Sequence, residues 1–326
     1  PPAAARDRPD AGADSPTEIP ARGWWQVLKR VVDRTSRDDV SIIAAGCAFY
    51  ALLALFPGVT ALVSIYGLLA DPAAIERQLA GLASVVPKEA VDLIAGQAHA
   101  VASTGRTALG WGAALALLLA LYGATSWVKT LFEALNIAYE QEERRGFLRL
   151  NLAAFAFTLA AVVGVATAIA VIVGVPAALR FLPLGPLAAW AVRIVSWLTL
   201  AALVVVGIGL LYRFGPSRAP ARWRWITPGS LVAAGLWLAA SVAFSFYAAR
   251  FGAYNQTYGA LGGVIIILVW LWLGAFAVLL GAELNAELEL QTGGDTTTGA
   301  PLPKGERDAY VADHTAAERA ADPPAR

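Results

Sequence analysis

The sequence predicts an all-α integral membrane protein with six transmembrane helices, an amphipathic N-terminal helix and a helical extracytoplasmic insertion between the first two spans. Composition is the first observation behind this class: of 326 residues, 58% are hydrophobic and only 15% are charged, far from what a water-soluble domain needs. The second is a set of runs without Asp, Glu, Lys or Arg, namely residues 40–70, 107–128, 150–179, 194–212, 225–249 and 251–282. Each can cross a hydrocarbon core, which takes roughly 20 helical residues. Because the runs are continuously apolar rather than alternating, barrel strands are excluded.

Charge and cysteine content exclude several kinds of site. The formal net charge is +1, so the chain has no global basic field of the kind that attracts nucleic acid, and no nucleic-acid partner is expected. The single cysteine, Cys47, excludes an intramolecular disulfide and any multi-cysteine metal site. We expect no cofactor and no metal, and the sequence is compatible with a homo-oligomer.

The two ends of the chain differ from the spans. Residues 1–20 and 291–326 are poor in large apolar side chains, which predicts disordered tails. Residues 21–37 instead contain apolar side chains at helical spacing among basic ones, namely Trp24, Val27, Leu28 and Val31. We expect an amphipathic helix in the cytoplasmic headgroup layer, with a surface helix packed on the bundle as the alternative.

The transmembrane domain is expected to cover residues 38–290, with spans at about 40–70, 107–132, 148–179, 187–212, 226–249 and 259–283. Span one contains Pro57 and Gly58 near its middle. Proline removes a helical hydrogen bond and glycine loosens the backbone, so the sequence predicts a kink. Broken helices often mark substrate paths in transporters, but proline kinks are common in membrane helices, and both interpretations stay open.

The connection between the first two spans is too long for a simple loop. Pro72 and Pro87 stand where helices typically start, and apolar residues follow each at helical period. We therefore expect two amphipathic helices within residues 72–105 on the extracytoplasmic side, which either cap a cavity or pack on the bundle. His99 has no second ligand residue at metal-binding spacing there, which indicates a solvated histidine.

Basic residues are distributed unequally between the two sides of the spans. Twelve Lys and Arg residues flank the spans on the side of the chain ends, against five on the other side. By the positive-inside rule, the sequence predicts that both termini are cytoplasmic.

Three charged residues lie within or beside spans two and four. Lys129 and Glu133 stand four apart at the cytoplasmic end of span two, as expected for an interfacial contact between snorkelling side chains. Arg193 lies several residues inside the outer end of span four, where exposure to lipid is costly. We expect Arg193 to face the bundle interior on a path for an anionic group, with snorkelling to the outer headgroups as the alternative.

A polar turn separates spans five and six. Its side chains are expected to form an extracytoplasmic cluster that Arg193 can reach if spans four and five lie side by side: Arg250, Tyr254, Asn255 and Tyr258. Such tyrosines suit an interfacial aromatic belt.

Span six is unusual at both ends. It begins with small residues on which another helix can pack closely, namely Gly259, Gly262 and Gly263. It ends on polar residues at the cytoplasmic side, namely Glu283, Asn285 and Glu287. The two glutamates share one face of the helix, because they stand four residues apart.

These residues carry a family resemblance. The stretch "YNQTYGALGGVIIILVWLWLGAFAVLLGAELNAELE" resembles the C-terminal signature of the YihY/BrkB family of bacterial inner-membrane proteins. The stretches "AAGCAFYALLALFPGV" and "TLFEALNIAYE" resemble the first two spans of that family, and the similarity covers about residues 25 to 290. The resemblance implies a six-helix protein of the bacterial cytoplasmic membrane with an envelope or virulence association, in a family that has also been labelled ribonuclease BN.

Three classes of function stay open. A transporter, lipid translocase or channel is favoured by the kinked first span, Arg193 and the polar span ends, and would act on an anionic lipid or a small anionic substrate in envelope maintenance. A structural or scaffolding envelope protein needs only packing and would use the same residues as anchors. A membrane-associated nuclease is disfavoured, because two distant histidines, one cysteine and no clustered carboxylates outside the membrane predict no metal-nuclease site. No enzymatic activity is expected.

Overall fold

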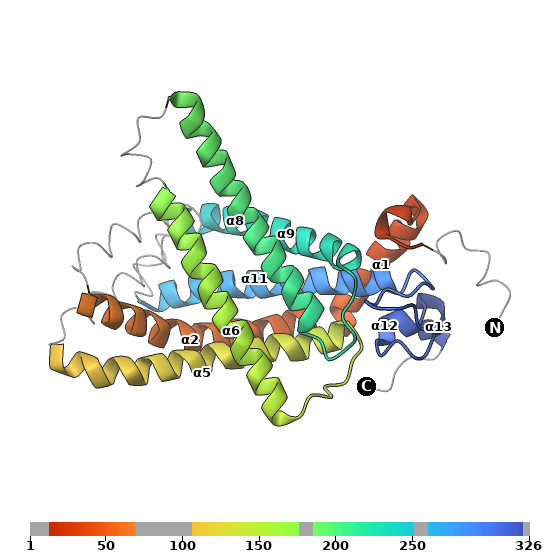
Figure 1. The fold of residues 1–326 in the computed structure, drawn as a ribbon, viewed down its shortest axis with the longest axis horizontal. Helices are drawn as coiled ribbons and strands as arrows, with labels where there is room; N and C mark the ends of the chain where they lie inside the picture. The colour runs from red at the N-terminus through yellow and green to blue at the C-terminus, as the bar shows by residue number, and fades with distance from the viewer. Residues whose placement is uncertain (1–12, 70–105, 176–184, 251–259, 322–326) are drawn as a thin grey trace.

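The computed structural model describes residues 13–69, 106–175, 185–250 and 260–321 (Figure 1). Among these residues it contains six helices long and apolar enough to cross a membrane, and no β-strand. The predicted class, an all-α multi-pass membrane protein, is confirmed. Several predictions fall outside the described residues: the helices within 72–105 with His99, the turn with Tyr254, Asn255 and Tyr258, and Gly259.

The long helices are α2 (Val40–Leu69), α5 (Arg106–Ala138), α6 (Phe147–Ile169), α8 (Pro186–Phe214), α9 (Trp223–Arg250) and α11 (Ala260–Glu289). The short elements are η2 (Pro16–Glu18), α1 (Ala21–Arg37), the π-helical turn η3 (Ala170–Gly174) directly after α6, α12 (Tyr310–Asp313) and α13 (Ala316–Ala321). Two helices, α5 and α11, run beyond their expected ends at residues 132 and 283. The polar last turns of α11 continue as helix because other parts of the protein bury every residue from Gly281 to Glu289.

Four helices, α2, α5, α9 and α11, run roughly along the long axis of the molecule, and α6 and α8 cross them obliquely (Figure 1). Helix α11 packs against α9, α2 and α1, and α2 packs against α5. Helix α6 contacts α5, and α8 contacts α9, but α6 and α8 touch each other little. The core therefore lies around α11, with α6 and α8 at its periphery.

Helices α9 and α11 cross at two glycines, Gly229 and Gly281. A Cβ atom added to either glycine would overlap the backbone oxygen of the other, so the two helices approach to backbone contact. Asn285 fixes this crossing, because its side-chain oxygen accepts a hydrogen bond from Gly229 N at 2.8 Å. The amide of Asn285 donates to the backbone oxygen of Ile226 at 3.1 Å.

The residues predicted for kinking and close packing occupy less crowded positions. Pro57 lies inside α2, which continues to Leu69 without a break. A Cβ atom added to Gly58 would find its nearest neighbour at 4.0 Å, and Gly262 and Gly263 are half-buried on α11. The roles proposed for these residues stay predictions.

Residues 13–20 and 291–321, for which the sequence predicts disorder, are ordered and pack against the bundle. Ala13 and Ile19 are buried in an apolar cluster with the end of α11, and Val311 is buried beside the ends of α5, α8 and α11. Composition alone indicates disorder because these segments have few large apolar side chains. Hydrogen bonds to the bundle and within the segments order them instead.

Arg307 organises residues 291–321, here called the C-terminal segment. Its guanidinium donates hydrogen bonds to the backbone oxygens of four residues, namely Gly293, Gly294, Leu302 and Ala312. The segment also joins α11 directly, since Ala316 N donates to Leu290 O at 2.8 Å. Helices α1, α12 and α13 lie at the same end of the bundle (Figure 1), here called the terminal end.

Candidate functional site

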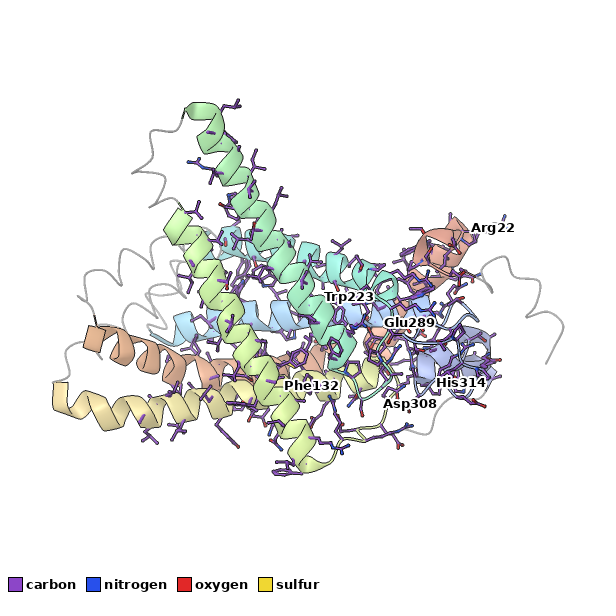
Figure 2. All side chains as sticks on the ribbon, in the orientation of Figure 1. Arg22, Phe132, Trp223, Glu289, Asp308 and His314 are labelled. Atoms are coloured by element: carbon purple, nitrogen blue, oxygen red, sulfur yellow. The ribbon has the colours of Figure 1, made fainter. Side chains whose placement is uncertain are left out.

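Five charged side chains meet at the terminal end and form what we call the charge cluster: Arg30, Arg34, Glu140, Glu287 and Arg319. They come from α1, the turn after α5, α11 and α13. The side chains of Glu287 and Glu140 are only 1% and 6% exposed. Figure 2 shows the side chains of this end of the molecule, where Glu289, Asp308 and His314 are labelled.

Glu287 is the centre of the charge cluster. Arg30 pairs with one of its carboxylate oxygens, and Arg30 Nη2 donates to Gln291 Oε1 at 2.7 Å. Arg319 Nη2 donates to the other carboxylate oxygen at 2.6 Å, and Arg34 Nε lies 4.0 Å from that same oxygen. Arginines from both ends of the chain therefore hold one buried carboxylate.

Glu140 joins the charge cluster from the turn after α5. Its φ of 54° lies in the left-handed region, which is sparsely occupied by residues other than glycine and turns the chain away from α5. Arg34 pairs with Glu140 and also approaches Asp38 at 3.4 Å. Arg319 Nη1 donates to Glu140 Oε1 at 3.2 Å, so one arginine of α13 links Glu140 to Glu287.

Residue spacing along α1 and α11 explains why the cluster forms. Val27 and Val31 of α1 pack in one apolar cluster with Leu284 and Leu288 of α11, so that an i,i+4 pair on each helix faces the other. The two arginines of α1 have the same spacing and lie beside this apolar contact. They reach Glu287 because it stands on the same part of α11.

A second buried ion pair lies beside the charge cluster. Arg218, in the α8–α9 loop, donates to both carboxylate oxygens of Glu289 at 3.1 and 2.7 Å, and the two side chains are 2% and 0% exposed. Thr296 Oγ1 donates to Glu289 at 2.5 Å, and the Arg218 guanidinium lies 5.0 Å from the centre of the Tyr139 ring. A bidentate geometry of this kind is among the stronger polar contacts in proteins.

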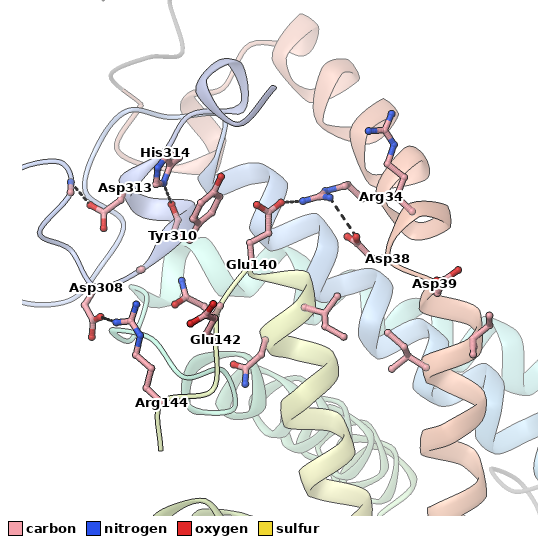
Figure 3. A pocket seen from close by; sticks show the side chains of 18 residues that line it. Arg34, Asp38, Asp39, Glu140, Glu142, Arg144, Asp308, Tyr310, Asp313 and His314 are labelled. Atoms are coloured by element: carbon pink, nitrogen blue, oxygen red, sulfur yellow. Dashed lines mark hydrogen bonds and ion pairs between the residues drawn. The ribbon is translucent and has the colours of Figure 1, made fainter. Parts of the chain in front are cut away.

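A pocket of about 1070 Å³ opens between the α1–α2 junction, the turn after α5 and the C-terminal segment (Figure 3). Its lining mixes carboxylates with arginines and includes Arg34 and Glu140 of the charge cluster. Arg144 and Asp308 pair at 2.5 Å beside it, and the His314 ring stacks on Tyr310 with centroids 4.1 Å apart. Within the described ranges, no group of three or more His, Cys, Asp or Glu side chains is placed to hold a metal ion.

The turn between α5 and α6 is clamped to the α8–α9 loop. Hydrogen bonds from the Arg145 side chain, with a smaller contribution from Asn136, lower the pKa of Glu143 to about 2. Arg145 also donates to Gly215 O at 2.7 Å, and Asn136 Oδ1 accepts from Ser217 N at 2.7 Å. Glu143 therefore binds both Arg145 and Asn136, the two side chains that reach the α8–α9 loop.

The polar residues predicted at the end of span six are all at most 2% exposed, namely Glu283, Asn285 and Glu287. They do not form one site: Glu287 belongs to the charge cluster, whereas Asn285 fixes the α9–α11 crossing. Lys129 and Glu133, predicted as a contact pair, point to different surroundings. Lys129 Nζ donates to Asn151 Oδ1 of α6 at 3.2 Å, and Glu133 is exposed.

Arg193 is exposed on α8, whereas the sequence predicts an inward-facing side chain. Only 6% of the residues in the most apolar 18-residue stretch of the α8 span are buried, so this helix has little interior for an arginine to enter. Arg250 is the last residue of α9, and the other members of the predicted outer cluster lie outside the described residues. A role for this cluster in a substrate path stays a prediction.

Sequence patterns do not identify the arginines of the charge cluster. Arg30 and Arg34 count only as basic residues on the terminal side of the spans, and Arg319 lies in a segment whose composition indicates disorder. One signal was present: three glutamates in the last two turns of an apolar helix need cationic partners if they are buried. Where those cations come from depends on chain folding that no local pattern encodes.

Comparison with known proteins gives consistent matches. A family model described as virulence factor BrkB matches residues 31–305. A putative ribonuclease-like protein, YfkH, of Bacillus subtilis is 26% identical over 272 residues, which cover 80% of this chain and 94% of the relative. A UPF0761 membrane protein of Pseudoalteromonas translucida is 28% identical over 276 residues, which cover 81% of this chain and 85% of the relative. No solved structure matches the chain.

Proposed function

The chain belongs to the virulence factor BrkB family, and we propose that it is a transporter or translocase that moves an anionic lipid or a small anion across the bacterial cytoplasmic membrane. Its six apolar helices support a multi-pass membrane location. The proposal places both termini in the cytoplasm, because basic residues outnumber those on the other side by twelve to five. The terminal end then faces the cytoplasm.

The observation that carries the proposal is the burial of Glu287 among three arginines at the end of the candidate span Gly262–Glu289. Burying an ion pair is expensive, and an apolar contact of similar volume is often as stable or more stable. Ionisable residues within membrane segments are accordingly rare and mark functional paths. A cluster that joins α1, α5, α11 and α13 suits a gate, because movement of any one of these elements breaks several of its contacts at once.

The arginines indicate the sign of the transported group. Movement of α1 away from α11 would free Arg30 and Arg34 from Glu287. A guanidinium binds a carboxylate or a phosphate through two parallel hydrogen bonds, so an anionic headgroup or a small anion can take the place of that glutamate.

A structural role in the envelope is the second candidate, and one observation favours it. Both carboxylate oxygens of Glu287 and one of Glu140 already accept hydrogen bonds from arginine. A cluster whose central carboxylate, Glu287, is paired on both oxygens needs no movement and would serve to fasten α1 and α13 to the bundle.

Reconstituted vesicles separate the two candidates. The purified chain is placed in vesicles of phosphatidylethanolamine and phosphatidylglycerol, and two rates are measured: flipping of a fluorescent phosphatidylglycerol, and efflux of a trapped small carboxylate. Transport predicts at least one rate above that of protein-free vesicles. Arg319→Ala should raise the rate because it removes the link between Glu140 and Glu287, whereas Arg144→Ala, which breaks an exposed pair at the same end, should leave it unchanged.

A folded protein without any flux would overturn transport. Suppose that Arg319→Ala has the same thermal midpoint as the native chain, and that both proteins give the flipping and efflux rates of protein-free vesicles. Transport is then rejected, and the structural role is the candidate that remains. Because the Bacillus relative is named ribonuclease-like, one more assay is needed. The purified chain incubated with RNA and a divalent metal ion should cleave none of it.

A further inference from the structure

Helix α1 has two apolar faces, and only one of them is covered by protein. At roughly 100° per residue, Val27 and Val31 lie on one side, and both are buried. Trp25, Leu28 and Val32 form a second stripe, about 110° around the helix from the first, and are 60%, 45% and 71% exposed. An exposed stripe of this kind on a helix with a fixed orientation calls for a partner.

The inner face fixes the orientation of α1. Val27 and Val31 pack with Trp225 and the last turns of α11, and Arg30 and Arg34 reach the charge cluster from the same side. Rotation of the helix to hide its outer stripe would break both sets of contacts. The sequence predicts a lipid face of Trp24, Val27, Leu28 and Val31, and of these only Leu28 belongs to the outer side.

The position of α1 indicates what covers the outer stripe. The helix packs beside Leu284 and Leu288, which belong to the candidate span Gly262–Glu289, and it ends just before the candidate span Val40–Gly58. Helix α1 therefore lies at the level where spans meet the membrane surface, inclined to α2 and α11 (Figure 1). Its outer face takes no part in the contact with α11 and is exposed to the surroundings of the protein.

The basic residues beside the outer stripe indicate that the lipid is anionic. Lys29 lies over the Trp25 ring at 5.2 Å from its centre, and Arg22 falls on the same side of the helix. Neither forms an ion pair with a residue in the part of the chain that the structure describes, whereas Arg30, Arg34 and Arg37 are all paired. An apolar stripe flanked by uncompensated cations is the pattern of helices that bind anionic membrane surfaces.

We infer that the outer face of α1 docks into an anionic leaflet, with Trp25, Leu28 and Val32 at the acyl boundary and Arg22 and Lys29 on lipid phosphates. The two faces of α1 then contact different partners. The inner face holds Glu287, and the outer face holds the membrane surface, so α1 connects the charge cluster to the lipid around it. The inference depends on the membrane location and not on transport, so it survives a negative flux assay.

A single fluorescent label tests this docking in the full chain. Cys47 is the sole cysteine and is buried, so Cys47→Ala gives a background without thiols. Leu28→Cys places a polarity-sensitive label on the outer face, and Thr298→Cys places the same label on an exposed position of the C-terminal segment as a matched control. Both proteins are reconstituted in phosphatidylcholine vesicles with and without phosphatidylglycerol, using brominated acyl chains as the quencher.

The expected result is quenching at position 28 and none at position 298. Phosphatidylglycerol should strengthen the quenching at position 28 by about twofold or more, and Arg22→Gln with Lys29→Gln should remove that increase. Three outcomes overturn the inference. A label at position 28 that iodide quenches as strongly as one at 298 means that the face is in water; equal quenching with and without phosphatidylglycerol rejects the anionic lipid. A label shielded from both quenchers means that protein, such as a second copy, covers the face.

Discussion

From Gly281 in the last turns of α11 to Thr292 just beyond the helix, every residue is buried. In the most apolar 18-residue stretches of the α6 and α8 spans, only 6% of the residues are buried. The first region is crowded with glutamates, arginines and backbone hydrogen bonds. The second is almost purely apolar, and its side chains point outward along most of its length. The two regions belong to one bundle, but the protein itself supplies the partners of the first and leaves those of the second to its surroundings.

The difference follows from what each kind of side chain requires. A buried carboxylate costs several kcal/mol unless it is paired and hydrogen-bonded, so the end of α11 gathers arginines from α1, the α8–α9 loop and α13. An apolar side chain in a membrane is already satisfied by lipid, and helix association there depends on close packing alone. The π-helical turn Ala170–Gly174 follows α6 directly, and a local widening of this kind often accompanies functional sites.

Because the terminal end depends on partners within the protein and the outer faces of α6 and α8 do not, substitutions at the terminal end should affect stability strongly. Substitutions on the outer faces of α6 and α8 should affect it little.

The largest effect is expected at the α9–α11 crossing. Gly281→Leu would force the two backbones apart and displace Tyr212, whose hydroxyl lies where the new side chain would begin. We expect a loss of about 4 kcal/mol or more, which few membrane domains survive. Yield of monodisperse protein and the thermal midpoint in detergent measure it. Gly235→Leu is the control, because Gly235 is exposed on α9 and has open space around it. An equal effect at both glycines would contradict the close approach of α9 and α11 at Gly281.

The second effect concerns the charge cluster. Glu287→Ala leaves Arg30 and Arg319 without their shared carboxylate, and we expect a loss of about 3 kcal/mol. The thermal midpoint of Glu142→Ala, an exposed carboxylate beside the pocket, should not move. Adding Arg319→Ala to Glu287→Ala should recover part of the loss, because it removes a cation that no longer has its main partner. A midpoint for Glu287→Ala equal to that of Glu142→Ala would mean that the cluster contributes nothing to the fold.

These two sites show how much could be predicted from the sequence. The spans follow from hydropathy, because each helix needs only lipid around it, and Glu283, Asn285 and Glu287 stand out as polar residues on an apolar helix. Their partners could not be predicted, since Arg319 is 32 residues from Glu287 along the chain in a segment with little apolar content. Similarly, Gly262 and Gly263 fit a packing motif, but the crossing shown by the structure uses Gly281 and Gly229, whose meeting depends on how two distant helices align.

A third prediction is that the C-terminal segment can be loosened without destabilising the helical bundle. Arg307→Ala removes the hydrogen bonds to four backbone oxygens, one of them buried and three part-buried, and we expect a local loss of about 2 kcal/mol. The segment should then be trimmed by protease at a higher rate while the thermal midpoint of the helices changes little. Arg144→Ala, which breaks an exposed pair, should be trimmed like the native chain. Unchanged trimming of Arg307→Ala would show that other contacts suffice to hold the segment.

A fourth prediction uses pH. The pKa of Glu143 is lowered from 4.5 to about 2, first by the Arg145 hydrogen bonds. A lowered folded-state pKa adds stability that is fully present above pH 4.5 and is lost as the pH falls toward 2. We expect exposure of the α5–α6 turn, measured by hydrogen exchange, to rise over that window. Glu143→Gln should flatten the response, and a native response that persists in this variant would assign it to another carboxylate.

The smallest effect is expected on the outer face of α8. Leu198 is 64% exposed, whereas Phe132 of α5 is fully buried and meets Phe157 of α6 edge to face at 5.3 Å between ring centroids. Phe132→Ala should cost about 3 kcal/mol through the cavity it leaves, whereas Leu198→Ala should cost less than about 0.5 kcal/mol because lipid or detergent fills the space. The thermal midpoints of both variants are measured in detergent and in vesicles.

Equal effects of these two substitutions would break the contrast between the two regions, because Leu198 would then have to be packed against protein. The remaining candidate for such a partner is a second copy of the chain, so cross-linking in vesicles should show a dimer in the native protein and lose it in Leu198→Ala. Arg193 is exposed on the same helix, and a dimer through this face would give that arginine the enclosed surroundings that one chain does not provide. A small effect at Leu198 without a cross-linked dimer instead leaves Arg193 among lipid headgroups, where its long side chain can reach the membrane surface.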